Sequence, residues 1–404
     1  MRALWLTMIL LASGPGSAPA AEPVLEKTDL WEAGVGGYEL YRIPCLIATS
    51  RGSLIACCEA RKSAKGDWGQ IDVVARRSTD GGKTWSPSGK IVELKGTFER
   101  NPAAVAQGLG KPGEVTINNP VLIADRQPGL VHLLYCIEYG RCFYSRSEDD
   151  GETFSTGVEV TAAFDAFRPE YDWKVLATGP GHSIQLRSGR LVVPVWLSLG
   201  TGGHAHRPSV TSTIFSDDAG KTWRRGEIAV PNTSEFINPN ETTAVELADG
   251  RVMLNVRTES KVHRRAIVTS SDGATGWSAP RFDDALVEPI CMGSLVRWSW
   301  PEEGRGGRIL FSNPDNLKRR DGKEKAGSGR DRVNLTVRLS RDEGRTWIGS
   351  QSLEPGFSGY SDLAVGPDGS AWCLYERGST DGKNIYQTRF LTVARFNEDW
   401  LTAR

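Results

Sequence analysis

Residues 78–85 read STDGGKTW, and the pattern Ser-x-Asp-x-Gly-x-Thr-aromatic returns further along the chain. The other full copies are SEDDGETF at 147–154, SDDAGKTW at 216–223 and SRDEGRTW at 340–347, while SSDGATGW at 270–277 keeps only the Ser, Asp and Trp. Asp and Gly form turns because Asp bonds to nearby backbone amides and Gly adopts positive φ. The motif therefore predicts a hairpin turn whose terminal aromatic packs between neighbouring sheets, in a unit that repeats along the chain.

A second repeat is independent of the first. Short β-rich runs such as RVMLNVR at 251–257 follow a glycine turn, and an apolar stretch such as TAVELAD at 243–249 precedes it. The turn glycines are Gly52, Gly129, Gly189, Gly250, Gly307 and Gly369. No long stretch shows the 3.6-residue apolar period of a helix. The sequence therefore predicts an all-β fold, a six-bladed β-propeller, closed by pairing the segment near Leu30 with strands near the C-terminus.

The N-terminus has the features of a signal peptide. Arg2 is followed by an apolar run at 3–12, and SAPA at 17–20 offers an A-x-A cleavage site. The apolar run is shorter than the roughly 20 residues that a bilayer span requires. We expect residues 1–20 to be removed and residues 21–404 to form one propeller domain. The mature protein should be secreted or periplasmic, without membrane insertion.

Composition excludes several classes of partner. Basic and acidic side chains balance at 49 each, so no overall field favours nucleic acid or a membrane. The basic stretch LKRRDGKEKAGSGR at 317–330 is predicted to be a solvated loop. The seven cysteines lack paired C-x-x-C motifs and are expected to be mostly buried apolar residues. His204 and His206 lack further ligands at metal-binding spacing, so we expect loop residues near the rim of a site, with no metal and no cofactor.

Charged and aromatic residues recur at one end of the predicted sheets. The first strand of each unit starts, and the second ends, at the same end, because the two strands are antiparallel. Arg42 starts the first unit, Glu241 and Arg257 flank another, and Tyr360 and Glu376 flank the last. We therefore expect a ligand site on that face of the molecule.

Particular motifs resemble those of sialidases (neuraminidases). YRIP at 41–44 is similar to the F/Y-R-I-P motif of that family, with Tyr in place of the commoner Phe. The family also carries repeats of the Ser-x-Asp-x-Gly-x-Thr-aromatic motif described above, which are called Asp boxes. The similarity covers essentially the whole mature chain, including GPGHSIQL at 179–186 and the segment at 240–257. The resemblance implies an exo-α-sialidase that hydrolyses terminal sialic acids from sialylated glycans.

The resemblance also implies three arginines that bind the substrate carboxylate. Arg42 in YRIP matches the first, and Arg257 matches the second. The third should lie between the stretch FSNP at 311–314 and the last Asp box. We assign it to Arg332, ahead of Arg330 and Arg338.

The remaining site residues follow from the same resemblance. Asp67, in the loop GDWGQID, matches the acid/base aspartate, and Glu241 and Tyr360 match the glutamate–tyrosine pair. Arg61 resembles an extra arginine that borders the pocket. Glu376 resembles an acid that holds the first arginine in place. The apolar pocket for the N-acetyl group is left open among Trp68, Trp173, Trp196 and Met292.

The chemistry of sialic acid explains this choice of residues. Its carboxylate lies on the anomeric carbon, where arginines supply planar, charge-assisted hydrogen bonds. That carboxylate would repel an anionic nucleophile, and sialidases use tyrosine instead. Glu241 would take the proton of Tyr360, and Asp67 would act first as acid and then as base. Asp67 then needs a raised pKa, or the enzyme an acidic optimum. The expected mechanism retains configuration through a tyrosine-linked intermediate.

Three alternatives remain open. A trans-sialidase would use the same residues. A non-catalytic glycan-binding propeller would tolerate the loss of Asp67 or Tyr360, both of which are present. A glycosidase of another Asp-box family would need a carboxylate pair and no set of three arginines.

Overall fold

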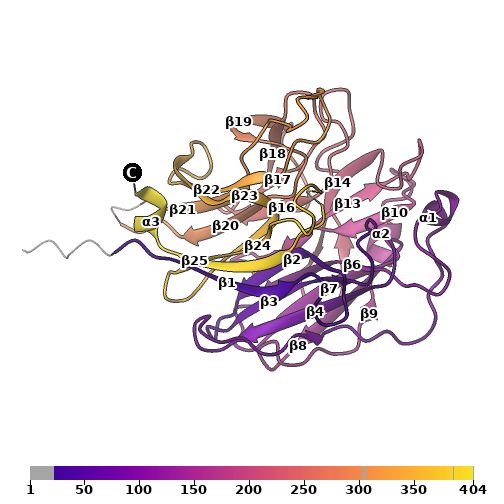
Figure 1. The fold of residues 1–404 in the computed structure, drawn as a ribbon, viewed down its shortest axis with the longest axis horizontal. Coiled ribbons are helices and arrows are strands. Elements are labelled where there is room, and N and C mark those ends of the chain that lie inside the picture. The colour runs from indigo at the N-terminus through magenta and orange to yellow at the C-terminus, as the bar shows by residue number, and fades with distance from the viewer. Residues whose placement is uncertain (1–21, 304–305, 385, 404) are drawn as a thin grey trace, which may run out of the picture.

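Strands dominate the computed structural model, which describes residues 22–303, 306–384 and 386–403 (Figure 1). Strands make up 44% of the chain and helices 4%, which confirms the all-β prediction. The described helices are α1 (Pro102–Ala106), α2 (Ala162–Asp165) and α3 (Glu398–Thr402). In the described residues we find no helix that could cross a bilayer. The predicted signal peptide at residues 1–20 lies outside the described residues.

The first half of the chain contributes three sheets. The first has the order β2 (Leu40–Ala48), β3 (Leu54–Arg61), β4 (Ile71–Ser78), β5 (Gly89–Lys90). The second has the order β11 (Gly181–His182), β6 (Ile117–Ala124), β7 (Val131–Ile137), β8 (Arg141–Ser147), β9 (Val158–Glu159). The third has the order β10 (Val175–Thr178), β13 (Leu191–Ser198), β14 (Ser209–Ser216), β15 (Arg224–Arg225), with β12 (Ile184–Gln185) also on β13.

The second half contributes two more sheets. One has the order β16 (Thr242–Glu246), β17 (Val252–Val256), β18 (Arg264–Ser270), β19 (Arg281–Val287). The other is seven-stranded, in the order β1 (Leu25–Glu32), β25 (Phe390–Phe396), β24 (Ala371–Arg377), β23 (Ile348–Val365), β22 (Val333–Ser340), β21 (Arg308–Pro314), β20 (Ser294–Ser299). Each strand–turn–strand unit read from the sequence is an antiparallel pair within these sheets.

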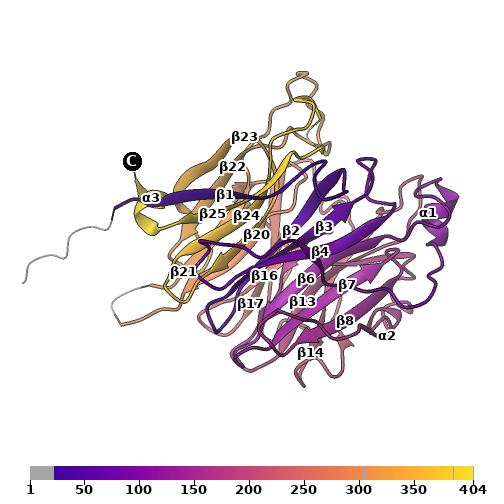
Figure 2. The same cartoon turned by 60° about the horizontal axis from the view of Figure 1, so that its bottom comes forward.

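The long strand β23 joins two groups of strands. Residues 348–357 pair with β22, whereas residues 358–365 pair with β24. At the far edge β1 pairs antiparallel with β25, so the N-terminal and C-terminal strands lie side by side (Figure 2). The predicted pairing of the segment near Leu30 with the C-terminal strands is therefore confirmed.

The repeated motif forms the predicted turn. At 78–85 the Ser78 hydroxyl accepts a hydrogen bond from the Gly82 amide (2.9 Å), and Asp80 accepts from the amide and hydroxyl of Thr84 (3.0 and 2.6 Å). In the degraded copy, Thr275 stands one residue earlier, and its amide still donates to Asp272 (2.8 Å). That copy therefore keeps a Ser–Asp turn despite its altered sequence.

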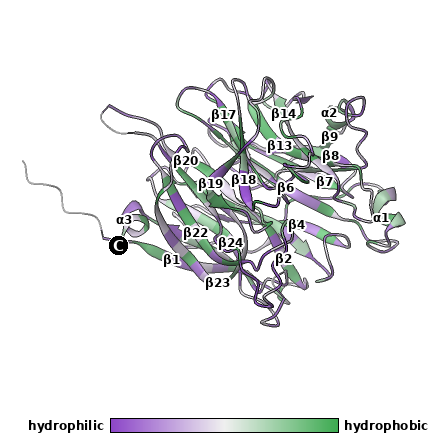
Figure 3. Ribbon diagram, turned by 90° about the horizontal axis from the view of Figure 1, so that it is seen from above, coloured by the Kyte–Doolittle hydropathy of each residue, from purple (hydrophilic) through white to green (hydrophobic). Residues whose placement is uncertain are grey.

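The hydrophobic core lies between neighbouring sheets. Trp85, the aromatic of the first box, packs on a cluster that includes Leu54 of β3 and Trp372 of β24. Gly82 lies so close to Trp372 that a Cβ there would stand 2.2 Å from the ring, so the turn requires glycine. Figure 3 shows hydrophobic segments along the strands. The seven cysteines are all buried and free, as expected.

Candidate active site

A cavity of about 440 Å³ opens where several sheets present their strand ends. Six of the eight predicted site residues line it, namely Arg42, Asp67, Glu241, Arg257, Arg332 and Tyr360. The other two lie directly behind the wall, where Arg61 contacts Asp67 and Glu376 contacts Arg42. The structure thus brings together the full set proposed from the sequence.

The backbone positions these side chains at matching strand ends. Arg42 lies near the start of β2, where a register shift between Arg42 and Cys45 coincides with a positive φ at Ile43 (60°). Arg257 directly follows β17, and Glu241 directly precedes β16. Because these two strands are antiparallel, the flanking residues emerge at the same edge of the sheet.

The three arginines surround Tyr360. Arg257 Nη1 donates to Tyr360 Oη (2.8 Å). The guanidinium carbons of Arg42 and Arg332 lie 5.2 and 5.0 Å from the centre of the Tyr360 ring. All three arginines line the cavity, so one anionic group placed there would meet all of them.

The two alternatives to Arg332 lie elsewhere. Arg330 donates to the carbonyl oxygens of Lys325 and Ser328 within its own loop (3.0 and 2.8 Å). Arg338 forms an ion pair with Asp315 (2.7 Å). Neither of these arginines lines the cavity that holds Tyr360.

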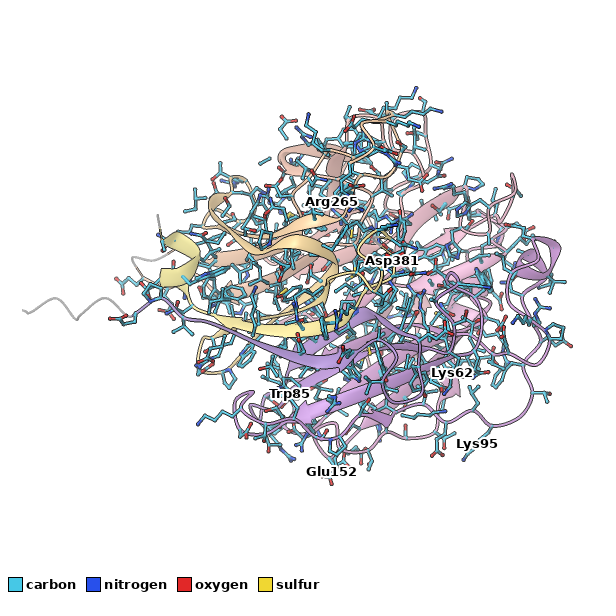
Figure 4. All side chains as sticks on the ribbon, in the orientation of Figure 1. Lys62, Trp85, Lys95, Glu152, Arg265 and Asp381 are labelled. Carbon is cyan, nitrogen blue, oxygen red and sulfur yellow. The ribbon has the colours of Figure 1, made fainter. Side chains whose placement is uncertain are left out.

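Arg332 is held in place by a buried brace. Its Nη2 donates to the carbonyl oxygen of Ile290 (2.9 Å), and the Ile290 amide donates to Glu288 (2.7 Å). Glu288 forms an ion pair with Arg265, which is labelled in Figure 4, and both side chains are fully buried. The ion pair of Arg265 and Glu288, which lies outside the cavity, thus fixes the position of Ile290, whose carbonyl oxygen accepts from Arg332.

Tyr360 and Glu241 form a close hydrogen-bonded pair. Tyr360 Oη donates to Glu241 Oε1 at 2.5 Å, and Arg257 forms an ion pair with the same carboxylate. Burial raises the pKa of Tyr360 above its usual range, although Arg257 favours the ionised phenol. A buried phenol of this kind needs a base to become a nucleophile, and Glu241 is in contact with its proton.

Asp67 faces two arginines at the cavity mouth. Its Oδ1 lies 2.9 Å from Arg61 Nη1 and 3.7 Å from Arg42 Nη1, and its side chain is 41% exposed. Burial works to raise the pKa of this carboxyl, but the charges of Arg61 and Arg42 hold it below its usual range. The first of the two alternatives considered from the sequence, a raised pKa of Asp67, is therefore not observed.

Glu376 supports both Arg42 and Tyr360. Its Oε1 accepts from Arg42 Nε (3.0 Å) and from the Ile43 amide (3.2 Å), and its Oε2 accepts from the Tyr360 amide (3.1 Å). The side chain is 1% exposed. One buried carboxylate therefore fixes the position of an arginine and of the tyrosine relative to each other.

Further residues of the cavity wall escaped the sequence analysis. They include Asn119, Tyr139, Arg207, Asn240, Glu259, Ile290 and Tyr386. Tyr139 follows β7 as Arg257 follows β17, so the strand-end argument extended to the second unit would have indicated it. Tyr386 comes from a loop without a repeat pattern, and only its packing against Arg332 (4.7 Å) reveals it.

The two loop histidines and the candidate pocket residues can also be placed. His204 and His206 line the cavity, and within the described residues no group of three or more His, Cys, Asp or Glu side chains is arranged for a metal. Trp68 and Trp196 belong to one aromatic cluster beside the cavity. Trp173 lies in a different core, and Met292 packs beneath Tyr360.

Comparisons with known proteins agree with this geometry. The BNR repeat-like domain matches residues 100–373, and a BNR/Asp-box repeat matches residues 76–87. The sialidase of Micromonospora viridifaciens is 28% identical over 96% of this chain and 56% of its own length. The sialidase of Bacteroides fragilis is 28% identical over 85% of this chain and 61% of its own length.

Solved structures give the same answer for the fold. The Hadza microbial sialidase Hz136 superposes with a TM-score of 0.69 and 25% identity, covering 93% of this chain and 69% of that one. The intramolecular trans-sialidase from Ruminococcus gnavus superposes with a TM-score of 0.71 and 20% identity, covering 93% and 98%. This chain belongs to the BNR repeat-like domain family, within the group of bacterial-type sialidases. It spans little more than half the length of the two curated bacterial relatives.

Proposed function

We propose that this protein is a glycoside hydrolase, an exo-α-sialidase that releases terminal sialic acids from sialylated glycans with retention of configuration. The observation that carries the proposal is the hydrogen-bonded pair of Tyr360 and Glu241, enclosed by three arginines in one cavity. A carboxylate-based glycosidase needs no such ring of arginines around a tyrosine.

The arginines supply a binding site for the sugar carboxylate. Arg42 is neutralised by Glu376 and Arg257 by Glu241, whereas Arg332 rests on a carbonyl oxygen and has no ion pair among the described residues. Buried positive charge without a partner is costly, so an anionic ligand would stabilise this arrangement. The planar guanidinium groups match a carboxylate better than lysines would.

The tyrosine mechanism proceeds in two displacements. Glu241 takes the phenolic proton as Tyr360 Oη attacks the anomeric carbon, while Asp67 protonates the departing glycosidic oxygen. The bond from the anomeric carbon to that oxygen breaks as the bond to Tyr360 forms. Water, deprotonated by Asp67, then displaces Tyr360, which recovers its proton from Glu241. Two inversions at one carbon retain the configuration.

The same proposal includes the whole propeller. Dividing the seven-stranded sheet within β23 leaves six groups of about four strands, which supports a six-bladed ring. Blades of this size are typical of β-propellers. We propose further that residues 1–20 direct export, that residues 21–404 form a single propeller domain, and that the mature protein is secreted or periplasmic.

A fluorogenic sialic acid glycoside tests the proposal. The protein should release the fluorophore, and proton NMR should show the α-anomer as the first product. Tyr360→Phe should lose most of this activity because the nucleophilic oxygen is gone. Tyr171→Phe, which removes a phenol that donates to the Pro208 carbonyl oxygen (2.8 Å) away from the cavity, is the matched control. Absence of release would leave a glycan-binding propeller, and transfer of the sugar to added lactose would indicate a trans-sialidase.

A further inference from the structure

Ile290, in the cavity wall, has a backbone conformation that its own side chain disfavours. Its φ is 66°, in the left-handed region, where a β-branched residue is a true outlier. Such strained conformations persist only where the surrounding structure enforces them, and they gather at functional sites. The backbone at Ile290 must therefore be held by its neighbours, and its strain indicates a role in the site.

The carboxylate of Glu288 holds this strained turn. Its Oε1 accepts hydrogen bonds from two consecutive amides, those of Ile290 (2.7 Å) and Cys291 (2.9 Å). Its Oε2 accepts from Arg265 Nη1 (2.5 Å). Arg265 also donates to the Cys291 carbonyl oxygen (3.1 Å) and to the side chain of Asn255 in β17 (2.6 Å). The side chains of Glu288 and Arg265 are fully buried, so water cannot replace these contacts and the turn is fixed from several directions.

The strained turn directs a carbonyl oxygen at Arg332. The Ile290 carbonyl oxygen accepts from Arg332 Nη2 at 2.9 Å, and in the described part of the chain this is the hydrogen bond that the Arg332 side chain makes. The rings of Tyr360 and Tyr386 lie 5.0 and 4.7 Å from its guanidinium carbon. Ring contacts of this kind are less directional than a hydrogen bond, so the direction of the guanidinium depends on Ile290.

We infer that Glu288 is a positioning residue for recognition of the substrate carboxylate, and that it acts on Arg332 through Ile290. The inference rests on the proposed function. Arg42 and Arg257 are each held by a direct ion pair, which partly neutralises their charge. A neutral carbonyl oxygen orients Arg332 and leaves its full charge available for a charge-assisted hydrogen bond to the sugar. The charge of Glu288 itself is balanced by its own ion pair outside the cavity.

Recognition of the carboxylate can be measured as a ratio of two rates. We would compare kcat/KM for an aryl sialoside with kcat/KM for its C1 methyl ester, which has the same leaving group and no negative charge. The acid-to-ester ratio does not depend on how much of a preparation is folded, so a residue with a merely structural role does not change it. The unchanged protein should prefer the acid by at least about 10-fold, because charge-assisted hydrogen bonds are lost with the ester.

Two double variants that differ in one acceptor oxygen isolate the role of Glu288. Arg265→Met/Glu288→Met and Arg265→Met/Glu288→Gln both remove the buried charges together, an exchange that buried ion pairs often tolerate. The glutamine keeps an oxygen that can accept from the amides of Ile290 and Cys291, and the methionine does not. The methionine variant should therefore lower the acid-to-ester ratio by roughly 10-fold, whereas the glutamine variant should keep most of it.

Arg297→Met/Glu343→Met is the matched control and should keep the ratio, because Glu343 likewise accepts from an amide, that of Ala248 (2.8 Å), but lies outside the cavity wall. If the variant with two methionines at 265 and 288 does not fold, Glu288→Gln alone provides the test. Its one remaining oxygen is drawn to Arg265, so the ratio should fall.

Three results would overturn the inference while leaving a sialidase. The unchanged protein could cleave the acid and the ester at equal rates. The ratio could stay unchanged in the methionine variant or in Glu288→Gln. The glutamine double variant could lose as much of the ratio as the methionine variant. Failure of the unchanged protein to cleave the acid would instead overturn the proposed function.

Discussion

At the scale of single residues, Asp67 combines two requirements that conflict. A general acid must hold a proton, yet Arg61 and Arg42 keep the pKa of this carboxyl below its usual range. The carboxylate of a bound substrate would partly neutralise Arg42, and it would also repel a charged Asp67. Both effects favour protonation of Asp67 when substrate is bound. The sequence could indicate the residue but not this balance, because Arg61 and Arg42 reach Asp67 only in the folded chain.

Replacing Asp67 by Ala separates the acid role from a structural one. Hydrolysis of a natural sialoside with a sugar leaving group should fall by roughly 10²- to 10⁴-fold. An aryl sialoside needs little protonation of its leaving oxygen and should lose far less. Steady-state kinetics on both substrates give the comparison. Equal losses on the two substrates would assign Asp67 a role in holding Arg61.

Tyr360 should form a covalent bond to the sugar. Its phenol is buried against Glu241 and Arg257, and the anionic anomeric centre disfavours a carboxylate as nucleophile. A sialic acid analogue fluorinated beside the anomeric carbon should slow breakdown of the intermediate. Mass spectrometry of the digested adduct should then find the sugar on the peptide that contains Tyr360. Label on Glu241 or Asp67, or an inverted first product, would contradict the tyrosine mechanism.

At the scale of elements, the turns were predictable and the loops were not. The Asp boxes and glycine turns depend on neighbouring residues, so local chemistry marks each strand pair. The extent of β23 depends on its two partners β22 and β24, which the sequence does not reveal. The part of the cavity wall that Tyr386 contributes likewise depends on how loops pack, so no sequence pattern predicts it.

Strand β23 carries Tyr360 and also Gly359, whose lack of a side chain leaves room for the supporting carboxylate of Glu376. A Cβ on Gly359 would stand 2.2 Å from Glu376 Oε2, so Gly359→Ala must displace the carboxylate from Arg42 and from the Tyr360 amide. Loss of charge-assisted hydrogen bonds of this kind predicts a fall in kcat/KM of roughly 10- to 150-fold.

A second glycine of the same strand provides the control for this prediction. At Gly356 an added Cβ would meet only Glu354, at an ordinary 3.6 Å. Gly356→Ala should therefore leave kcat/KM almost unchanged. Thermal unfolding of both variants shows whether the effect of Gly359→Ala is confined to the site. Similar kinetics for the two variants would mean that the Glu376 brace does not govern activity.

At the scale of the whole molecule, Asp362 ties together strands that are distant in the chain. It accepts hydrogen bonds from the Leu46 amide of β2 (2.8 Å), from Nδ1 of His182 in β11 (2.7 Å) and from the Ser294 hydroxyl of β20 (2.8 Å). Asp362 lies two residues after Tyr360 on β23. The GPGHSIQL motif, for which the sequence gives no role, thus supplies a contact that joins separate sheets.

This contact should make stability depend on pH. Burial alone would lower the pKa of His182, but the Asp362 carboxylate outweighs it and raises the pKa above the usual value. A histidine whose pKa is raised by folding stabilises the native state while it is protonated in both states. That contribution is complete below the unfolded pKa of about 6.5 and is lost as the pH rises through the folded value. Replacing His182 by Asn should therefore cost more stability at low pH than at high pH.

Urea unfolding between about pH 5.5 and about pH 8.5 measures the difference in unfolding free energy between the unchanged protein and His182→Asn. We expect this difference to shrink steadily as the pH rises. His132 provides an internal contrast, because burial lowers its pKa despite its contact with Asp125 (3.0 Å). The cost of His132→Asn should therefore grow as the pH rises, since a histidine held neutral by folding opposes folding when the unfolded chain can take up a proton. If the stability lost in the two variants changed with pH in the same way, the charge of His182 would contribute nothing to the hydrogen bonds of Asp362.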